Sequence, residues 1–573
     1  KNRRSPPTAS LRASGDTHGR DTLSFTGTDS VGKLNLSGTA AANQFVFNDD
    51  TLTTEQLSDP ASGDTARVVS TLHSRDISSF DLGRANGDYA LDGNTRLSAG
   101  LGYYSFRSRG VFEGAYASSA LTGPLAQDYQ TAGTDLGDGH VFNVSSNVRR
   151  DFGGEDHQLT AAFTFSSNSV NNASTQAFAY ALPAQPDLFE AFVTADTHSS
   201  TDLKLEYHGP LPGAAKLVAG YEFNLERDGS DRTGQLGTDA ADATVDQAQS
   251  DRFSSSQAVH DLYATYDRSF GRLEVMPGLR LEGVVVDTDQ LIAGVTGRSS
   301  YFELYPTLHA TYKLTSAVQL AASYSRRVSR PPTSELNPFR TEYTPLNFAQ
   351  GNPDLKPAIT DSFEADYEYN GQKFTYEVDG FYKDTHDVVS SITESLGGGA
   401  LLATYENFGH YREGGADLSA SLKVSPKLSL SASGDVAWNA YANPDAAQQQ
   451  ARAGLSSSAK GKVNWDVTPK DFVQLEVYAE GHNVSAQGYT GAYSFVELGW
   501  RHKFGDRLTF EATVLDPFNT LREVSFIETP TLSQHTSEYP HLRALQLGFT
   551  YAFGGGKAPN SRDFDFGGGG PPH

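Results

Sequence analysis

Apolar and polar residues alternate with a period of two along almost the whole chain. Near position 160, Leu159, Ala161, Phe163 and Phe165 occupy every second place between mostly polar neighbours. Because successive side chains of a strand point to opposite faces, such a segment indicates a strand with one apolar face. About 22 such segments follow one another, a pattern typical of a transmembrane β-barrel with one face in lipid and the other in an aqueous lumen.

The same alternation recurs in both halves of the chain, and further clear examples are residues 217–223, 363–369, 374–378, 473–479, 508–514 and 545–553. Soluble sandwiches and propellers also alternate, and they are the competing interpretation. Two features favour the barrel. The apolar face carries large residues on nearly every strand, and no blade or domain repeat is visible. The predicted fold is therefore all-β, a 22-stranded antiparallel transmembrane barrel.

The composition limits the function classes. The chain contains no Cys and a single Met, so nothing depends on a disulfide or a reactive thiol. A mean hydropathy of -0.45, with no apolar run of about eighteen residues, excludes a helical membrane span. The net charge of -24 argues against a nucleic-acid partner, which needs clustered Lys and Arg. The 27 Tyr and 33 Phe suit the aromatic girdles of a membrane barrel.

The connections between strands alternate between short turns and long loops. The short turns are rich in residues that accept or fix unusual φ angles, and they lie at 92–94, 153–155, 209–213, 270–271, 315–316, 370–371, 425–427, 468–470 and 505–506. The long loops are predicted at 49–65, 107–138, 170–190, 227–250, 287–299, 327–357, 385–400, 439–450 and 522–537. In outer-membrane barrels the short turns are periplasmic and the long loops extracellular.

Three regions are predicted: a junction at 1–7, the barrel at 8–553 and a tail at 554–573. The tail is rich in Gly and Pro, so we expect it to be a flexible periplasmic segment. It contains Asp563, Phe564, Asp565 and Phe566, and a partner-binding role for this aromatic and acidic stretch stays open beside an inert one. The chain opens on Lys1 without an apolar leader, so a secretory signal was removed or the chain is a piece of something longer.

Several motifs in the second half closely resemble those of TonB-dependent outer-membrane receptors. They occupy residues 325–332, 335–339, 351–357, 405–409 and 514–519, in the family's order, and the last strand ends on an aromatic residue as outer-membrane proteins do. The motif residues carried over to this chain are Arg326, Arg327, Arg330, Asn337, Pro338, Gly351, Asn352, Pro353, Asp354, Lys356 and Pro357. The first half agrees only in its strand pattern.

The resemblance implies a barrel closed by an N-terminal plug, which imports a scarce nutrient such as a siderophore across the outer membrane of a Gram-negative bacterium. It implies as partners the plug and the energy-coupling TonB protein. Membrane lipid with lipopolysaccharide and the barrel-insertion machinery are expected partners of an outer-membrane barrel, and other envelope proteins are expected partners of a scaffold. The chain departs from the family in showing neither a plug nor a TonB box. Residues 1–4 look like the junction after a plug that was cut away or left out, although a naturally plugless member is the alternative.

Alternative interpretations stay open both for residues 351–357 and for the arginines before them. Residues 351–357 contain two prolines that fix φ and remove donors, so they suit a rigid re-entry of the loop into the wall, and contact with a ligand is the other reading. Arg326, Arg327, Arg330 and Arg340 suit an anionic solute. They equally suit pairing with carboxylates of the same loop, namely Glu335, Glu342 and Asp354.

Charged residues within the predicted strands are expected to face the lumen, because each would cost about 2–4 kcal/mol at the lipid midplane. The candidates for lumen contacts are Arg280, Glu282, Glu364, Asp366, Glu377, Asp379, Glu476, Glu497 and Arg501. Carboxylates outnumber arginines among them, so such a wall suits cations or a basic plug surface. A merely solvated wall is the alternative.

No catalytic or cofactor motif is present. The acidic loop from Asp228 to Asp251 lacks the ligand spacing of a calcium-binding hand. Asp16, His18 and Asp21 have no second cluster that would complete a metal shell. We therefore expect no enzyme, no cofactor and no metal site. Besides the transporter, a plugless passive pore and a structural or scaffold component of an outer-membrane assembly remain as alternatives.

Overall fold

The computed structural model describes residues 6–58, 65–121, 124–154, 156–292, 294–397, 399–442, 452–554 and 564. These residues are almost entirely strand, with one helical turn, α1 (Thr333–Leu336). No helix in this part of the chain is long and apolar enough to cross a membrane. The predicted junction at 1–7 and tail at 554–573 fall mostly outside the described residues.

Within the described ranges, 22 antiparallel strands form a closed barrel wall, which confirms the predicted fold. The wall strands are β1 (Thr8–Asp16), β2 (Asp21–Val31), β3 (Leu34–Ser58), β4 (Thr65–Ala90), β5 (Thr95–Ala120), β6 (Leu125–Asp151), β7 (Gln158–Leu182), β8 (Leu188–Leu211), β9 (Ala215–Gly237), β10 (Thr244–Phe270), β11 (Leu273–Gln290), β12 (Val295–Lys313), β13 (Val318–Ser329), β16 (Ala358–Asn370), β17 (Phe374–His386), β20 (His410–Ser425), β21 (Leu428–Ala442), β22 (Arg452–Asp466), β23 (Asp471–Glu480), β26 (Tyr493–Lys503), β27 (Leu508–Leu515) and β30 (Ala544–Gly554). The barrel closes where β1 pairs with β30, from Thr8 opposite Gly554 to Asp16 opposite Gln546.

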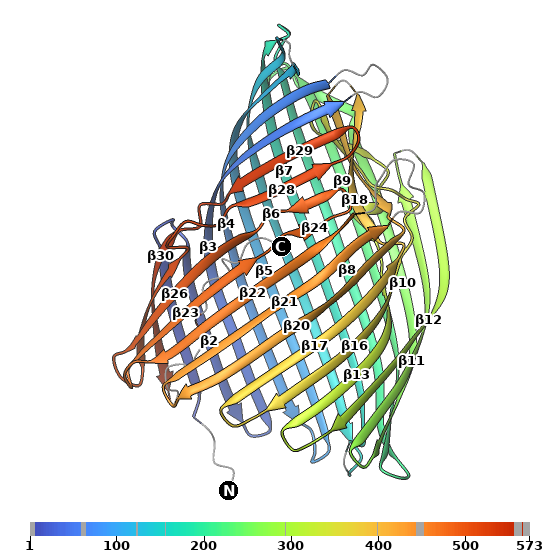
Figure 1. Ribbon diagram of the computed structural model, residues 1–573, viewed down its shortest axis with the longest axis vertical. Helices are drawn as coiled ribbons and strands as arrows, with labels where there is room; N and C mark the ends of the chain where they lie inside the picture. Colours follow the sequence, from blue (N-terminus) through green and yellow to red (C-terminus); the bar gives the residue numbers. More distant parts are fainter. Residues whose placement is uncertain are drawn as a thin grey trace.

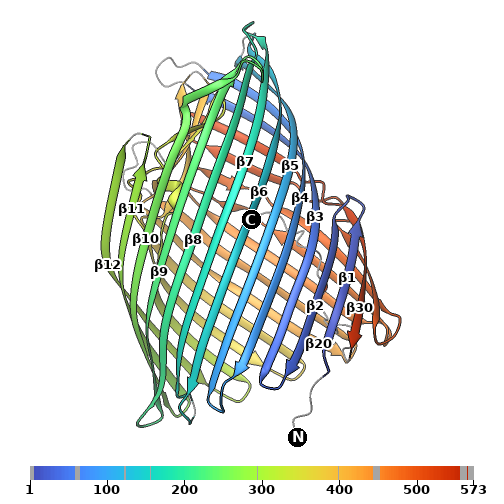
Figure 2. The ribbon, with the colours of Figure 1, turned by 180° about the vertical axis from the view of Figure 1, so that it is seen from behind.

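Four short strands extend this wall at its upper edge, namely β24 (Asn483–Val484), β25 (Gly488–Thr490), β28 (Glu523–Glu528) and β29 (Leu532–Tyr539). The last of them pairs with the upper part of β3. A separate four-stranded sheet contains β14 (Arg340–Thr344), β15 (Asn347–Gln350), β18 (Val389–Gly397) and β19 (Ala400–Asn407). Figures 1 and 2 show the front and back of the barrel.

The alternation of residues decides which face each side chain takes. On β30, Leu547 and Phe549 are 45% and 50% exposed, whereas Thr550 and Ala552 on the opposite face are buried. Large apolar side chains that touch little protein form the outer face, which meets acyl chains in a membrane. The opposite, inner face lines the lumen.

Several predicted loops turn out to be strands. The expected loops at 107–138 and 227–250 are largely the upper parts of β5, β6, β9 and β10, and the one at 170–190 belongs mostly to β7 and β8. A strand needs only about 9–11 residues to cross the membrane, while β5 and β6 have 26 and 27. Above the membrane both faces meet water, so the hydrogen-bonded ladder continues without the apolar alternation that reveals it. Figure 2 shows these strands rising well above the rest of the wall.

The remaining loops are shorter or structured. Only 291–294 separates β11 from β12, whereas the loops at 327–357, 385–400 and 522–537 contain strands of their own. The predicted loops at 49–65 and 439–450 lie partly outside the described residues. The short turns occur at their predicted positions, and in one of them Gly153 and Gly154 both adopt positive φ, at 86° and 87°.

A charge on the outer face should destabilise the barrel, while a charge one residue away on the inner face should not. Leu418 of β20 is 50% exposed on the outer face, and Ser419 lies opposite Glu377 on the inner face. We expect Leu418→Lys to lower the free energy of unfolding from lipid vesicles by about 2–4 kcal/mol. The matched variant Ser419→Lys should cost clearly less. Equal losses in denaturant titrations would contradict this assignment of faces.

Candidate functional site

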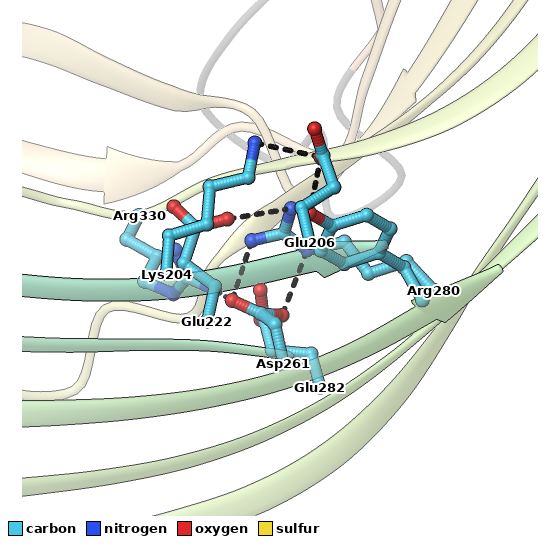
Figure 3. A network of polar contacts seen from close by, with 8 residues as sticks. Lys204, Glu206, Glu222, Asp261, Arg280, Glu282 and Arg330 are labelled. Atoms are coloured by element: carbon cyan, nitrogen blue, oxygen red, sulfur yellow. Dashed lines mark hydrogen bonds and ion pairs between the residues drawn. The ribbon is translucent and has the colours of Figure 1, made fainter. Parts of the chain in front are cut away.

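A network of charged side chains lies on the inner face of β8 to β11 (Figure 3). Arg280 of β11 donates two hydrogen bonds to Asp261 of β10, from Nε at 2.7 Å and from Nη2 at 2.5 Å. Its Nη1 lies 3.6 Å from Glu222 of β9. The side chain of Asp261 is only 2% exposed, so this arginine supplies the positive charge that makes a buried carboxylate tolerable.

The network continues on β8, where Glu206 collects three donors. Its carboxylate accepts a hydrogen bond from Tyr263 at 2.6 Å and lies 2.9 Å from Lys204 Nζ and 2.8 Å from His208 Nε2. On the other side, Arg330, at the end of β13, binds Glu282 of β11. Its Nε also donates to the hydroxyl of Tyr301 at 2.9 Å. One continuous polar surface therefore runs from β8 to the loop after β13.

A second inner surface carries a row of four acidic residues. Asp366, Asp379, Asp417 and Asp435 lie directly opposite one another on β16, β17, β20 and β21. Glu364, two residues before Asp366 on the same face of β16, accepts a hydrogen bond from Ser323. Like charges at directly opposed positions destabilise a sheet. This acidic row therefore favours a cationic partner in the lumen.

Two loops combine into one small sheet above the lumen. Residues 330–357 connect β13 to β16, and residues 387–409 connect β17 to β20. The sheet order is β14-β15-β19-β18, with β15 and β19 parallel, so each loop contributes a hairpin. We call these two segments the lid.

The lid is held to β10 by side-chain hydrogen bonds. Asn337 Nδ2 donates to Asp251 Oδ2 at 2.8 Å, and Gln249 Nε2 donates to Glu342 Oε2 at 2.6 Å. A third contact lies away from β10, just before β25. There Gln487 exchanges hydrogen bonds of 2.7 and 3.2 Å with the backbone of Thr393 in β18.

An apolar cluster joins the lid to the far side of the wall. Its buried members are Leu57, Val68, Tyr116, Tyr129, Phe178, Leu401 and Leu532, and Leu346 packs against them. Leu401 and Leu346 come from the lid, whereas the tyrosines, on β5 and β6, stack at 4.6 Å between ring centres. The lid starts on β13 to β20, and this cluster connects it to β3 to β7, which lie on the other side of the barrel (Figures 1 and 2). It therefore spans the lumen at the extracellular end.

A cavity of about 610 Å³ lies between the base of the lid and the inner wall. The wall contributes polar side chains that include His198 and Asp228, whose Nδ1 and Oδ1 atoms lie 2.6 Å apart. The lid contributes Arg330 to Ser334 and Asn337. The size and the mixed charges suit one bulky polar solute.

The structure does not bring the four motif arginines together. Arg326 binds Asp361 with two hydrogen bonds of 2.9 Å, on the outer face beside Tyr324. Arg330 binds Glu282 as described, Arg340 lies over the ring of Phe348 at 4.5 Å, and Arg327 is exposed. A common anion site of these arginines stays a prediction without geometric support.

Residues 351–357, at the end of the first lid segment, are hydrogen-bonded to β19 in the second lid segment. Asn352 Nδ2 donates to the carbonyl of Tyr405, and its Oδ1 accepts the backbone N–H of Asp354. Lys356 and Asn407 exchange two hydrogen bonds of 2.8 Å. The remaining motif residues, Pro338, Gly351, Pro353 and Pro357, lie in the same connection. This geometry fits the interpretation that residues 351–357 return the loop rigidly to the wall.

The predicted lumen candidates all lie on the inner face, although their roles in binding stay predictions. Besides those already described, Glu377 faces Glu368 across the strand pair, and Glu476 faces Glu497. Lys460 and Lys462 contact Glu476 at 2.5 and 3.4 Å. Arg501 binds Glu511 at 2.7 Å.

Sequence reasoning missed that Phe564 lies against this inner wall. Its ring stacks on Phe472 at 5.7 Å between centres, with the guanidinium of Arg501 4.5 Å away. Its backbone N–H donates to Gln474 Oε1 at 3.2 Å. Gly499 makes room, because a Cβ there would lie 2.8 Å from the ring. The Asp-Phe-Asp-Phe motif was a signal for such a contact, but nothing in its composition identifies the surface it meets.

Removing Arg280 should destabilise the wall because it leaves the Asp261 carboxylate buried without its main partner. We expect Arg280→Ala to cost about 1–3 kcal/mol in the free energy of unfolding. The double variant Arg280→Ala with Asp261→Asn should recover part of this loss, because the amide carries no charge. A double variant that is as unstable as the sum of the two single variants would refute the coupling.

The lid should dock more tightly in mild acid. Burial raises the pKa of the carboxyl groups of Glu335, Glu342 and Glu406 in the lid. A docked lid therefore binds more protons than an undocked one in the window between the ordinary and raised pKa values, so docking strengthens as the pH falls through the raised values.

Hydrogen exchange of residues 389–407, corrected for the intrinsic rate, measures this docking. We expect protection to rise as the pH is lowered toward the ordinary range of a glutamate carboxyl, and to rise less in Glu342→Gln, which keeps an acceptor for Gln249 but cannot titrate. Protection that rises equally in both proteins would rule out Glu342 as a contributor.

A profile of the outer membrane protein beta-barrel family matches residues 150–551, more than half of the chain. No curated protein sequence matches this chain. Among solved structures, the chain is similar to the siderophore receptor PiuA from Acinetobacter baumannii, with 12% identity, a TM-score of 0.62 and coverage of 96% of this chain and 82% of that one.

It is also similar to the ferric-catecholate import receptor Fiu from K12 E. coli, with 11% identity, a TM-score of 0.63 and coverage of 96% and 82%. For the copper transporter OprC, the identity is 14%, the TM-score 0.58 and the coverage 96% and 80%. Identities this low show a shared fold. The family match shows that the chain belongs to the outer membrane protein beta-barrel family. The chain therefore resides in the outer membrane of a Gram-negative bacterium.

Proposed function

We propose that this chain is the barrel of a TonB-dependent receptor that imports a bulky, scarce solute of the ferric siderophore class. The observation that carries the proposal is the lid, which spans the extracellular end of the lumen and is fastened on opposite sides of the wall. A freely diffusive pore needs an open lumen, which this structure covers. A receptor needs such a cover, because it must hold a solute before energy is supplied for its passage.

The cavity below the lid supports a binding step. Its volume of about 610 Å³ lies in the range of about 300–1,000 Å³ that ligand pockets occupy. Its lining combines carboxylates, a histidine and Arg330, so it offers both donors and acceptors to a polar solute. Arg330 links this cavity to Glu282 on the wall, which couples the lid base to the charged surface below.

The acidic row supports a plug as the internal partner. Asp366, Asp379, Asp417 and Asp435 face the lumen from four adjacent strands. Arginine and lysine side chains on a plug would relieve the repulsion within the row. The energy-coupling TonB protein would then act on that plug from the periplasm, as the resemblance implies.

Genetic deletion followed by growth on single nutrients tests the transport function. We expect the deletion strain to lose growth on one ferric siderophore or another single bulky nutrient, and the gene to restore it. Uptake should stop when the inner-membrane proton gradient is collapsed, because TonB-dependent import needs that energy. Uptake that continues, together with large steady conductance in planar bilayers, would instead establish a passive pore.

A disulfide lock tests the lid directly, because the chain has no cysteine of its own. Asn337 and Asp251 are in side-chain contact at 2.8 Å, so the pair Asn337→Cys and Asp251→Cys should join lid to wall. We expect the oxidised pair to block uptake and a reductant to restore it. Each single cysteine variant is the matched control, and its uptake should not differ between oxidising and reducing conditions. Undiminished uptake by the oxidised pair would contradict a moving lid.

A further inference from the structure

Three side chains that can bind a metal ion lie close together where the second lid segment, residues 387–409, leaves the wall. Asp384 and His386 lie at the upper end of β17, and His410 begins β20 directly opposite His386. Their ligand atoms all lie within 4.8 Å of one another. Among the described residues, no other group of three such side chains meets that condition.

The spacing in this group differs from that of the other histidine–carboxylate contacts. In the pairs of His73 with Asp50, His198 with Asp228, and His502 with Asp471, the closest atoms lie 2.6, 2.6 and 2.7 Å apart. These are hydrogen-bond distances. His410 Nδ1 instead lies 3.4 Å from Asp384 Oδ1, too far for a good hydrogen bond.

That longer distance is the one a shared metal ion requires. With ligand bonds of about 2.0–2.1 Å, the corners of a tetrahedral zinc site lie roughly 3.3 Å apart. The rings of His386 and His410 are nearly perpendicular, at 72°, with centres 4.4 Å apart. Two imidazoles beside one carboxylate can therefore surround an ion after small side-chain rotations.

The donor set selects the class of metal. Imidazole nitrogens with one carboxylate suit zinc and related transition metals, whereas calcium and magnesium prefer oxygen ligands. Asp384 turns its other oxygen, Oδ2, toward Arg412 Nε at 3.5 Å, which leaves Oδ1 for the ion. All three side chains are half-buried on the outer face, so the fourth position is open to water.

The location gives such an ion a structural consequence. Just above it, Asp387 N–H donates to the carbonyl of Gly409 at 2.7 Å, and Phe408 N–H donates to that of Val388 at 2.6 Å. Asp387 and Gly409 both have left-handed φ, at 54° and 47°, so the two strands change direction here. β17, β18 and β20 can be followed in Figure 1. An ion bound below this bend would join both strands at the base of the lid.

We propose that Asp384, His386 and His410 form a binding site for Zn²⁺ or a closely related transition metal on the outer face, at the point where residues 387–409 leave the wall. The site is separate from the lumen and does not depend on the transport function. It joins β17 to β20 through side chains where the backbone ladder bends.

Zinc titration of the purified, tag-free protein in detergent, against a chromophoric chelator, tests the site. We expect one ion per chain. The affinity should fall by more than about tenfold in His386→Ala and in His410→Ala, because losing a residue that merely orients a metal ligand already costs about 10–100-fold. His73→Ala is the matched control, because His73 and His541 contact Asp50 at hydrogen-bond distances of 2.6 and 2.7 Å. Its zinc affinity should stay unchanged.

X-ray absorption at the zinc edge of the loaded wild-type protein keeps the test independent of how the variants fold. Two imidazole ligands and one carboxylate, with a further oxygen, would support the site. Absence of binding, unaltered affinity in the double variant His386→Ala with His410→Ala, or a spectrum without two imidazoles would overturn it.

Discussion

Closure of the hydrogen-bonded ladder is the constraint on which the whole structure depends. A membrane interior contains no water to satisfy backbone N–H and C=O groups, so a sheet is stable there only without free edges. The pairing of β1 with β30 removes the last two edges. Once the wall is closed, its two faces meet different solvents, and every second residue is fixed as apolar or polar. The charged inner surfaces follow from that division.

The same constraint explains what the sequence predicts well. Alternation such as that of Leu545, Leu547 and Phe549 predicts the wall because lipid demands an apolar side chain at each of these positions. The short turns are equally visible, because Gly153 and Gly154 are needed for positive φ. Above the membrane this demand ends, so the upper parts of β5 and β6 look like loops in the sequence although their backbones continue to pair.

The site was less predictable because its contacts join distant segments. The charges of Arg280 and Asp261 are visible in the sequence, but their pairing depends on strand register. Leu346 lies in a predicted loop and Leu401 directly follows another, and only the folded structure shows that they meet Tyr116 and Tyr129 across the lumen. The histidines look scattered for the same reason, since His386 and His410 are neighbours only through the β17–β20 register. Periodicity reports the solvent of a side chain and not its partner.

The position of Phe564 has a consequence for anything else that enters the barrel. Its ring fills the space over Gly499 between Phe472 and Arg501, and two bodies cannot share that volume. A plug or solute that reaches this level must first displace the ring. Its binding free energy is therefore reduced by the free energy that holds the ring in place. Phe564 thus competes with any such guest for this part of the lumen, and its contacts with Phe472 and Arg501 set how readily the periplasmic half accepts one.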